Sequence, residues 1–202
     1  KAIQYLGMVD AESNRGLLAE IYAGTSDVSI KTRVLRAFMM AGDTEWVLQA
    51  ATGESDQELR GQAIRLLGMM GAREELRQLY DQEASREQKL QVLRAMFIGG
   101  DSTRLIELLA AESDAELRLA IIRNLGLVGD TGDVLRETYA SETDPRVRRA
   151  VIQALFIQQA DGALVEMARQ ETDRELQRDI VRRLSLMDSE TALAYLLEIL
   201  ER

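Results

Sequence analysis

The stretch SDAELRLAIIRNLGLVGD, from Ser113 to Asp130, is written almost a second time in this chain. Fifty-eight residues earlier, from Ser55 to Ala72, the sequence reads SDQELRGQAIRLLGMMGA. A segment that recurs at a fixed period is typical of repeat proteins, in which each copy packs on its neighbours. The period of this segment therefore decides the fold class.

The period is 29 or 30 residues, half of the distance between the two quoted stretches. Six successive copies begin at Asp27, Asp56, Ser85, Asp114, Asp144 and Asp173. Counted from each of these residues, positions 4, 8, 12 and 15 fall within one arc of a helix, which predicts a buried stripe. Asp and Ser are preferred at the start of a helix, and Gly just after its last turn. Gly stands at position 16 in four copies, as Gly42, Gly71, Gly100 and Gly129.

Each copy also predicts a second, shorter helix. The residues at which these short helices are expected to begin are Asp43, Asp101, Asp130 and Asp161. One pair of antiparallel helices cannot bury its apolar face alone, whereas stacked pairs share a continuous core. The side chains expected in that core include Leu59, Ala63, Leu67, Leu117, Ile121, Leu125, Val147, Val151 and Leu155.

The predicted fold is all-α, a right-handed α-α superhelix of about 14 helices in one solenoid. We expect a first long helix from Lys1 to about Val9, six pairs, and a last short helix from about Ser189 to Arg202. Lys1 is not a start methionine, so we expect a fragment of a longer chain. Any targeting segment would lie outside it, and the sequence leaves the compartment open.

The repeated pattern resembles the bacterial HEAT-like repeats that are also found in phycobilisome lyases. Its parts are the first Asp, a basic residue at position 5, an apolar pair at positions 8 and 9, and a closing Leu-Gly-x-x-Gly-Asp. The resemblance covers nearly the whole chain and implies a single HEAT-like array over residues 1–202. It also implies that the long helices line the concave side and that the basic residue at position 5 pairs with the Asp of a neighbouring repeat. This would give a structural role to Arg60, Lys89, Arg118 and Arg148, with Gln177 interrupting the ladder.

Composition excludes several classes of function. The chain carries a net charge of −9, which disfavours binding to nucleic-acid phosphates because such binding depends on Lys and Arg. It has neither Cys nor His, so disulfides, Cys/His zinc sites, thiol nucleophiles and imidazole acid–base catalysis are ruled out. No apolar run approaches the length of a membrane span. We expect no enzyme, no cofactor, no metal site and no membrane insertion.

A row of arginines marks the candidate binding surface. Position 10 of the long helices reads Gln4, Arg36, Arg65, Arg94, Arg123, Gln153 and Arg182. This position lies roughly opposite the buried stripe, and Glu58, Glu87, Glu116 and Glu175 at position 3 would partly balance its charge. The row is either a solvated face or a charged surface that recognises a partner.

Position 13 alternates between small and large residues. It reads Gly7, Met39, Gly68, Phe97, Gly126, Phe156 and Ser185, which predicts a double repeat as the true unit. Two interpretations are open. A bulky side chain could fill the space left by Gly on each neighbouring helix, or Met39, Phe97 and Phe156 could be apolar contacts for a partner beside the arginines. Trp46, the only Trp, either lies half-buried between neighbours or contacts a partner on the convex side.

The function favoured by the sequence is a non-enzymatic scaffold that binds a protein or peptide along its concave face. Two alternatives are a nucleic-acid binder that uses the Arg row and a lyase-type protein that handles a chromophore. Apolar residues in the first and last helices also suggest end-to-end self-association. The first helix carries Ile3, Tyr5, Leu6, Met8 and Val9, and the last carries Leu193, Tyr195, Leu196, Ile199 and Leu200.

Overall fold

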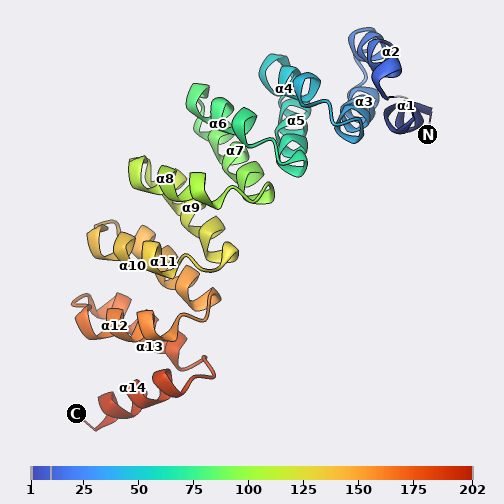
Figure 1. Cartoon of the computed structure of the whole chain (residues 1–202). Helices are drawn as coiled ribbons and strands as arrows, with labels where there is room; N and C mark the ends of the chain where they lie inside the picture. The colour runs from blue at the N-terminus through green and yellow to red at the C-terminus, as the bar shows by residue number, and fades with distance from the viewer. Residues whose placement is uncertain (1, 10, 202) are drawn as a thin grey trace. The chain divides into compact units, whose positions relative to one another are not determined.

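A computed structural model describes residues 2–9 and 11–201. Within these residues the chain forms 14 α-helices and no strand, so the predicted all-α, solenoid-like fold class is confirmed (Figure 1). The first seven helices are α1 (Ala2–Met8), α2 (Ala11–Ala23), α3 (Val28–Met40), α4 (Thr44–Gly53), α5 (Gln57–Met70), α6 (Arg73–Gln82) and α7 (Arg86–Ile98). The other seven are α8 (Ser102–Ala111), α9 (Ala115–Val128), α10 (Gly132–Ser141), α11 (Pro145–Ile157), α12 (Asp161–Gln170), α13 (Arg174–Leu184) and α14 (Glu190–Leu200). The expected outer ends at Lys1 and Arg202 lie outside the described residues.

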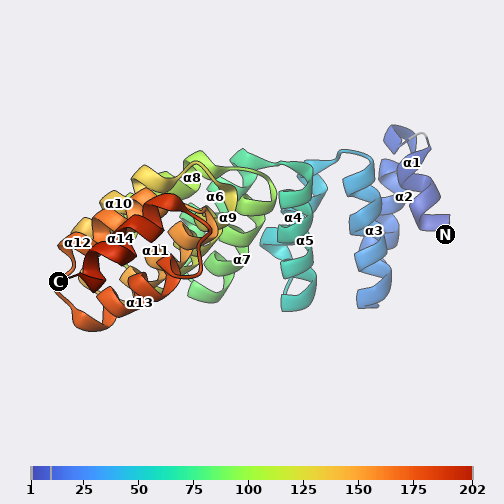
Figure 2. The same ribbon diagram turned by 90° about the horizontal axis from the view of Figure 1, so that it is seen from below.

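The helices belong to two compact units, residues 1–104 and residues 105–202. In the first unit α3, α5 and α7 lie side by side, and the shorter α4 and α6 pack against one side of them (Figures 1 and 2). In the second unit α9, α11 and α13 form the corresponding layer, covered by α10 and α12. That residues 1–202 form one array, and that its superhelix is right-handed, stay predictions.

The predicted starts of the long helices are confirmed. In all six copies the first Asp or Ser is the N-cap, and its side chain accepts a hydrogen bond from a backbone N–H of the first turn. The four glycines at position 16 all have φ between 67° and 78°, the left-handed region that favours Gly. In the copy that begins at Asp144, position 16 is Gln159, which adopts a similar left-handed conformation with φ 56°.

Three of the four predicted starts of the short helices are confirmed. Asp43 accepts a hydrogen bond from the backbone N–H of Trp46, and Asp101 accepts one from Arg104. Asp130 is not a cap, because its φ of 53° places it in the turn before α10, whose N-cap is Thr131. Asp161 is the first residue of α12, as predicted, and follows the N-cap Ala160.

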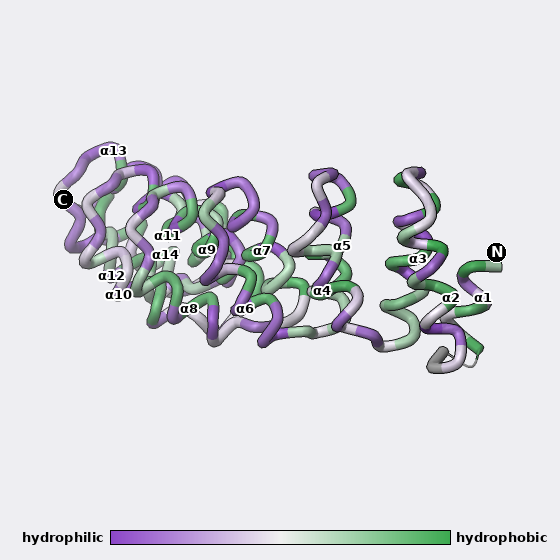
Figure 3. The backbone as a smooth tube through the Cα atoms, turned by 90° about the horizontal axis from the view of Figure 1, so that it is seen from above, coloured by the Kyte–Doolittle hydropathy of each residue, from purple (hydrophilic) through white to green (hydrophobic). Residues whose placement is uncertain are grey.

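The core is aliphatic, as its sequence pattern predicts. All nine side chains expected in the buried stripe are at most 3 % exposed. Hydrophilic and hydrophobic stretches alternate along α3 and α5 in Figure 3, as they must on helices that bury one side only.

Three pairs of neighbouring long helices, α1 with α3, α5 with α7 and α9 with α11, approach each other so closely that only Gly fits at position 13 of the first helix in each pair. A Cβ built on Gly68 would lie 2.6 Å from the carbonyl oxygen of Ala95, and one on Gly126 would lie 2.7 Å from the Cβ of Ala154. Gly7 has the same relation to Ala37. The interpretation that a bulky side chain fills the space left by Gly is therefore wrong, because the next helix brings its own backbone there, at an Ala in position 11.

Candidate protein-binding surface

The arginines of position 10 all lie on the exposed side of the long helices. Arg36, Arg65 and Arg94 are carried by α3, α5 and α7 in the first unit. Arg123 and Arg182 are carried by α9 and α13 in the second. The structure therefore places three of the predicted residues on neighbouring long helices of one unit, and two on α9 and α13 of the other, which are separated by α11.

These five arginines have no carboxylate partner among the described residues, unlike many other basic side chains such as Arg60 and Arg118. The glutamates of position 3 were expected to balance them. In the second unit Glu116 instead pairs with Arg146 at 2.9 Å, and Glu175 pairs with Arg149 at 2.7 Å. The charge of the Arg row is thus left uncompensated, even in a chain whose net charge is −9.

The large residues of position 13 are half-buried. Met39, Phe97 and Phe156 are neither in the core nor fully exposed. Phe156 is partly covered by Arg183 of the next long helix, whose guanidinium carbon lies 5.6 Å from the ring centroid. Each of these residues therefore retains an exposed edge, three positions along the helix from the position-10 residue.

The basic residue at position 5 has a structural role, but its partner differs from the expected one. Lys31, Arg60, Arg118 and Arg148 each pair with a glutamate that stands two residues before the N-cap of the next long helix. The pairs are Lys31 with Glu54 at 2.8 Å, Arg60 with Glu83 at 2.7 Å, Arg118 with Glu142 at 2.8 Å and Arg148 with Glu171 at 2.7 Å. The expected Asp partner is wrong because that side chain is already occupied as a helix cap.

Position 5 also closes the preceding short helix. Arg60 donates a hydrogen bond to the carbonyl of Ala51, and Arg118 donates one to Leu109. Gln177 donates a hydrogen bond to the carbonyl of Ala168, so it also satisfies the end of the short helix, although it cannot form an ion pair. Carbonyl groups at helix ends have no partner within the helix, and these side chains satisfy them.

Two glutamates of this ladder, Glu54 and Glu142, are held in their charged form. Burial alone would raise the pKa of Glu54, but hydrogen bonds from Lys31 and Tyr22 outweigh it and leave the pKa below its ordinary value. The pKa of Glu142 is lowered in the same way, against its burial, by backbone N–H groups and Arg118. Burial and the bond to Glu54 raise the pKa of Tyr22, so its hydroxyl stays protonated and donates.

A charged hollow of about 330 Å³ lies between α11 and α13 in the second unit. It is lined by Arg149, Glu175, Arg178, Asp179 and Arg182. Only Arg182 belongs to the predicted row. Arg178, one helical turn before it, was missed, although its spacing of four residues from Arg182 on an exposed face could have revealed it.

The described residues contain no group of three His, Cys, Asp or Glu side chains placed to hold a metal ion. None of the helices described is both long and apolar enough to cross a membrane.

Residues 102–161 match the protein family of HEAT repeats. The matched segment runs from α8 to α11. Together with the helical repeats on either side of it, the match supports a HEAT repeat protein. HEAT repeats generally serve as scaffolds for protein interaction, and they are typically not enzymes. No curated protein matches the chain significantly. The likeness to phycobilisome lyases and the bacterial origin stay predictions.

The glutamate ladder predicts a loss of stability in acid. A carboxyl group whose pKa is lower in the folded state than in the unfolded state stabilises the fold above the unfolded value, near 4.3, and this stability is lost as the pH falls through the folded value. We expect Glu54→Gln to lower the free energy of unfolding by about 1–3 kcal/mol at neutral pH and to flatten its decrease below about pH 4. Urea unfolding across this pH range measures both effects. The exposed Glu58→Gln serves as the control, and an unchanged acid profile for Glu54→Gln would contradict the assignment.

Proposed function

We propose that this chain is a non-enzymatic scaffold that binds an acidic protein or extended peptide along its long helices. The observation that carries the proposal is the row of five exposed arginines without carboxylate partners among the described residues. Most other basic side chains lie in ion pairs or against aromatic rings, so the row is the main positive surface that remains available. The HEAT repeat match supports the scaffold class.

Arginine suits this task because its planar guanidinium can bind a carboxylate with two hydrogen bonds at once. Arginine and aromatic residues are also enriched among the residues that dominate binding energy at protein interfaces. Met39 and Phe97 stand three residues after Arg36 and Arg94 on α3 and α7, within about 60° of them around the helix. Phe156 stands at the same distance from Gln153 on α11. A partner with alternating acidic and apolar side chains would match both rows.

The hollow between α11 and α13 supports an acidic partner further. Arg178 and Arg182 stand four residues apart on α13, a spacing that places two side chains on one face. Neither pairs with a carboxylate among the described residues, whereas Arg149 in the same hollow is held by Glu175. A partner carboxylate placed between the two free guanidinium groups would gain hydrogen bonds from both.

Nucleic acid is a poorer ligand for this surface. Its phosphates would meet Glu175 and Asp179 beside the free arginines, and the chain as a whole repels polyanions through its net charge of −9. A phosphate-binding protein also loses affinity steeply with salt, with a log–log slope of about −0.9 per contact. A peptide whose apolar side chains share the binding would show a much smaller slope.

Charge reversal in the Arg row tests the proposal. Arg65→Glu with Arg94→Glu should weaken binding of a fluorescein-labelled peptide rich in Glu and Leu by about 10- to 100-fold, because attraction becomes repulsion. Fluorescence anisotropy measures the affinity, and circular dichroism checks that the helices are kept.

The matched control is Arg136→Glu with Arg169→Glu, which changes the charge equally but on the short helices α10 and α12. Equal losses in both double variants would show a general charge effect and refute the Arg row. Tight binding to a DNA oligomer with a steep salt slope would favour the alternative function.

We further propose that the chain associates with itself through its first and last helices. Apolar side chains are exposed on α1, where Tyr5 is 65 % and Met8 is 67 % exposed, and on α14, where Leu193 is 58 % and Leu200 is 81 % exposed. Tyr195, also named from the sequence as part of this apolar end, is buried and is excluded from this surface. Apolar side chains gathered at the end of a repeat array commonly mediate association.

Sedimentation velocity over a range of concentrations tests this self-association. We expect oligomers of the natural sequence to dissociate when Leu193 and Leu200 are both replaced by Glu, since burying the new carboxylates is unfavourable. Leu127→Glu with Leu186→Glu provides a control of the same kind at exposed positions outside α1 and α14. A natural chain that remains monomeric at high concentration would contradict the proposal.

A further inference from the structure

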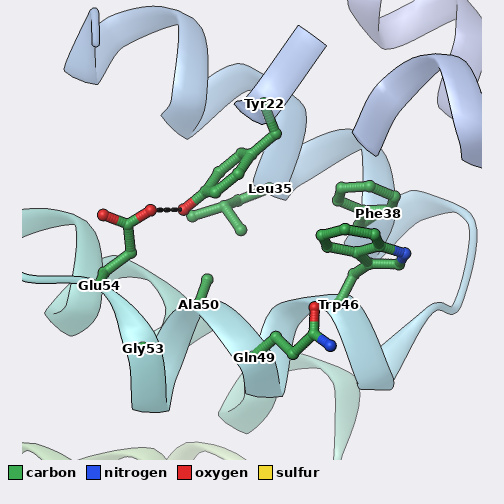
Figure 4. A pocket seen from close by; sticks show the side chains of 8 residues that line it. All are labelled: Tyr22, Leu35, Phe38, Trp46, Gln49, Ala50, Gly53 and Glu54. Carbon is green, nitrogen blue, oxygen red and sulfur yellow. Dashed lines mark hydrogen bonds between the residues drawn. The ribbon is translucent and has the colours of Figure 1, made fainter. Parts of the chain in front are cut away.

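A second hollow, of about 310 Å³, lies between α2, α3 and α4 in the first unit (Figure 4). One end is closed by Trp46, which stacks on Phe38 with ring centroids 5.2 Å apart and ring planes nearly parallel. At the other end the hydroxyl of Tyr22 donates to Glu54 at 2.6 Å. Leu35 lies between these two ends. The hollow is therefore an apolar trough with one aromatic wall.

The polar end of the trough offers no net charge. The carboxylate of Glu54 accepts hydrogen bonds from both Tyr22 and Lys31, the latter at 2.8 Å. The ammonium group of Lys31 also lies 4.7 Å from the ring centroid of Tyr22, on one face of that ring. A cationic ligand would have to compete with Lys31 for the same carboxylate and the same ring. The trough is suited to an uncharged, apolar group.

The second unit shows which residues leave this space open. A Tyr, a basic residue and a Glu recur there with the same spacing, as Tyr139, Arg148 and Glu171, all 117 residues later. The residue 117 positions after Ala50 is Met167, which is only 5 % exposed. The residue 117 positions after Gly53 is Gln170. A Cβ built on Gly53 would meet nothing within 4 Å, so there is space for a larger residue.

The second unit therefore offers an example of a side chain that suits the position left open in the first unit. In the second unit the methionine at this place in the repeat is buried, and at the equivalent place in the first unit an alanine lines the trough. The residue 117 positions after Trp46 is Ala163, so the aromatic wall of the trough has no counterpart at that position of the second unit. Methionine is unbranched and makes favourable contacts with aromatic rings, which suits a trough that ends at Trp46.

We propose that this trough binds an apolar side chain of methionine type from a partner polypeptide. Gln49, which is exposed at the mouth of the trough, is placed to hydrogen-bond the backbone of the same segment. The trough is built by α2, α3 and α4 and uses none of the arginines of the Arg row. It is thus a second contact surface that stands or fails independently of the proposed function.

Trp46 supplies the readout, because it is the only Trp in the chain and its indole N–H gives a single resonance. N-acetylmethioninamide serves as the probe, and N-acetylglutaminamide, a side chain of similar length but polar, serves as its control. We expect a saturable shift of the Trp46 resonance with the first compound and none with the second. No saturable shift, or an equal shift with both, would overturn the proposal.

Two variants test whether the probe binds in the trough. Ala50→Met supplies the side chain that the second unit carries, and Gly53→Leu adds one into open space; each should weaken probe binding at least about tenfold. If Ala50→Met fails to fold, Gly53→Leu still decides the question. Thr52→Leu, exposed on the same helix but outside the trough, should leave the affinity unchanged.

Unaltered affinity in both trough variants would show that the probe binds elsewhere. A second copy of the chain is the other occupant to exclude. If the Trp46 resonance shifts with protein concentration alone, and Ala50→Met removes that shift, a second copy fills the trough and the assignment to a partner polypeptide is wrong.

Discussion

The approach of Gly at position 13 to Ala at position 11 of the next long helix is the constraint on which the other regularities depend. Gly68 faces Ala95, and Gly126 faces Ala154, at distances that leave no room for a side chain. Such a contact forms where one of two neighbouring long helices carries Gly at position 13 and the other carries Ala at position 11. The long helices therefore alternate between two forms, and the unit that repeats is two helix pairs long.

The alternation extends to the ladder at position 5. Where position 11 is Ala, the basic residue lies over a tyrosine, as in Lys31 on Tyr22, Lys89 on Tyr80 and Arg148 on Tyr139. In the other form the short helix has Ala or Leu instead, and Arg60, Arg118 or Gln177 reaches its carbonyl. Position 10 does not follow this alternation, since Arg occurs there in both forms. Packing therefore does not explain the Arg row, which supports the proposal that it recognises a partner.

Local chemistry made part of this structure predictable. Asp at an N-cap, Gly in a left-handed turn and an apolar stripe act within a few residues, so Asp56, Gly71 and Leu67 were placed correctly from the sequence. The exposure of the Arg row follows from the same helical period. The Glu partner of position 5 and the trough beside Trp46 could not be predicted, because both depend on how loops and helices of different repeats meet. The trough needs a comparison of residues 117 positions apart, Ala50 with Met167, whose meaning appears only once the packing is known.

A double-mutant cycle at one close contact tests the central constraint most directly. Urea unfolding would be measured for Gly126→Ala, Ala154→Gly and the double variant, with Gly162→Ala as the control because a Cβ there meets nothing within 4 Å. We expect Gly126→Ala to cost about 1–3 kcal/mol and the control to cost nothing. The double variant should be more stable than the sum of the single effects by at least about 0.5 kcal/mol, since removing the Cβ of Ala154 relieves part of the clash. Additive effects, or a harmless Gly126→Ala, would contradict the account.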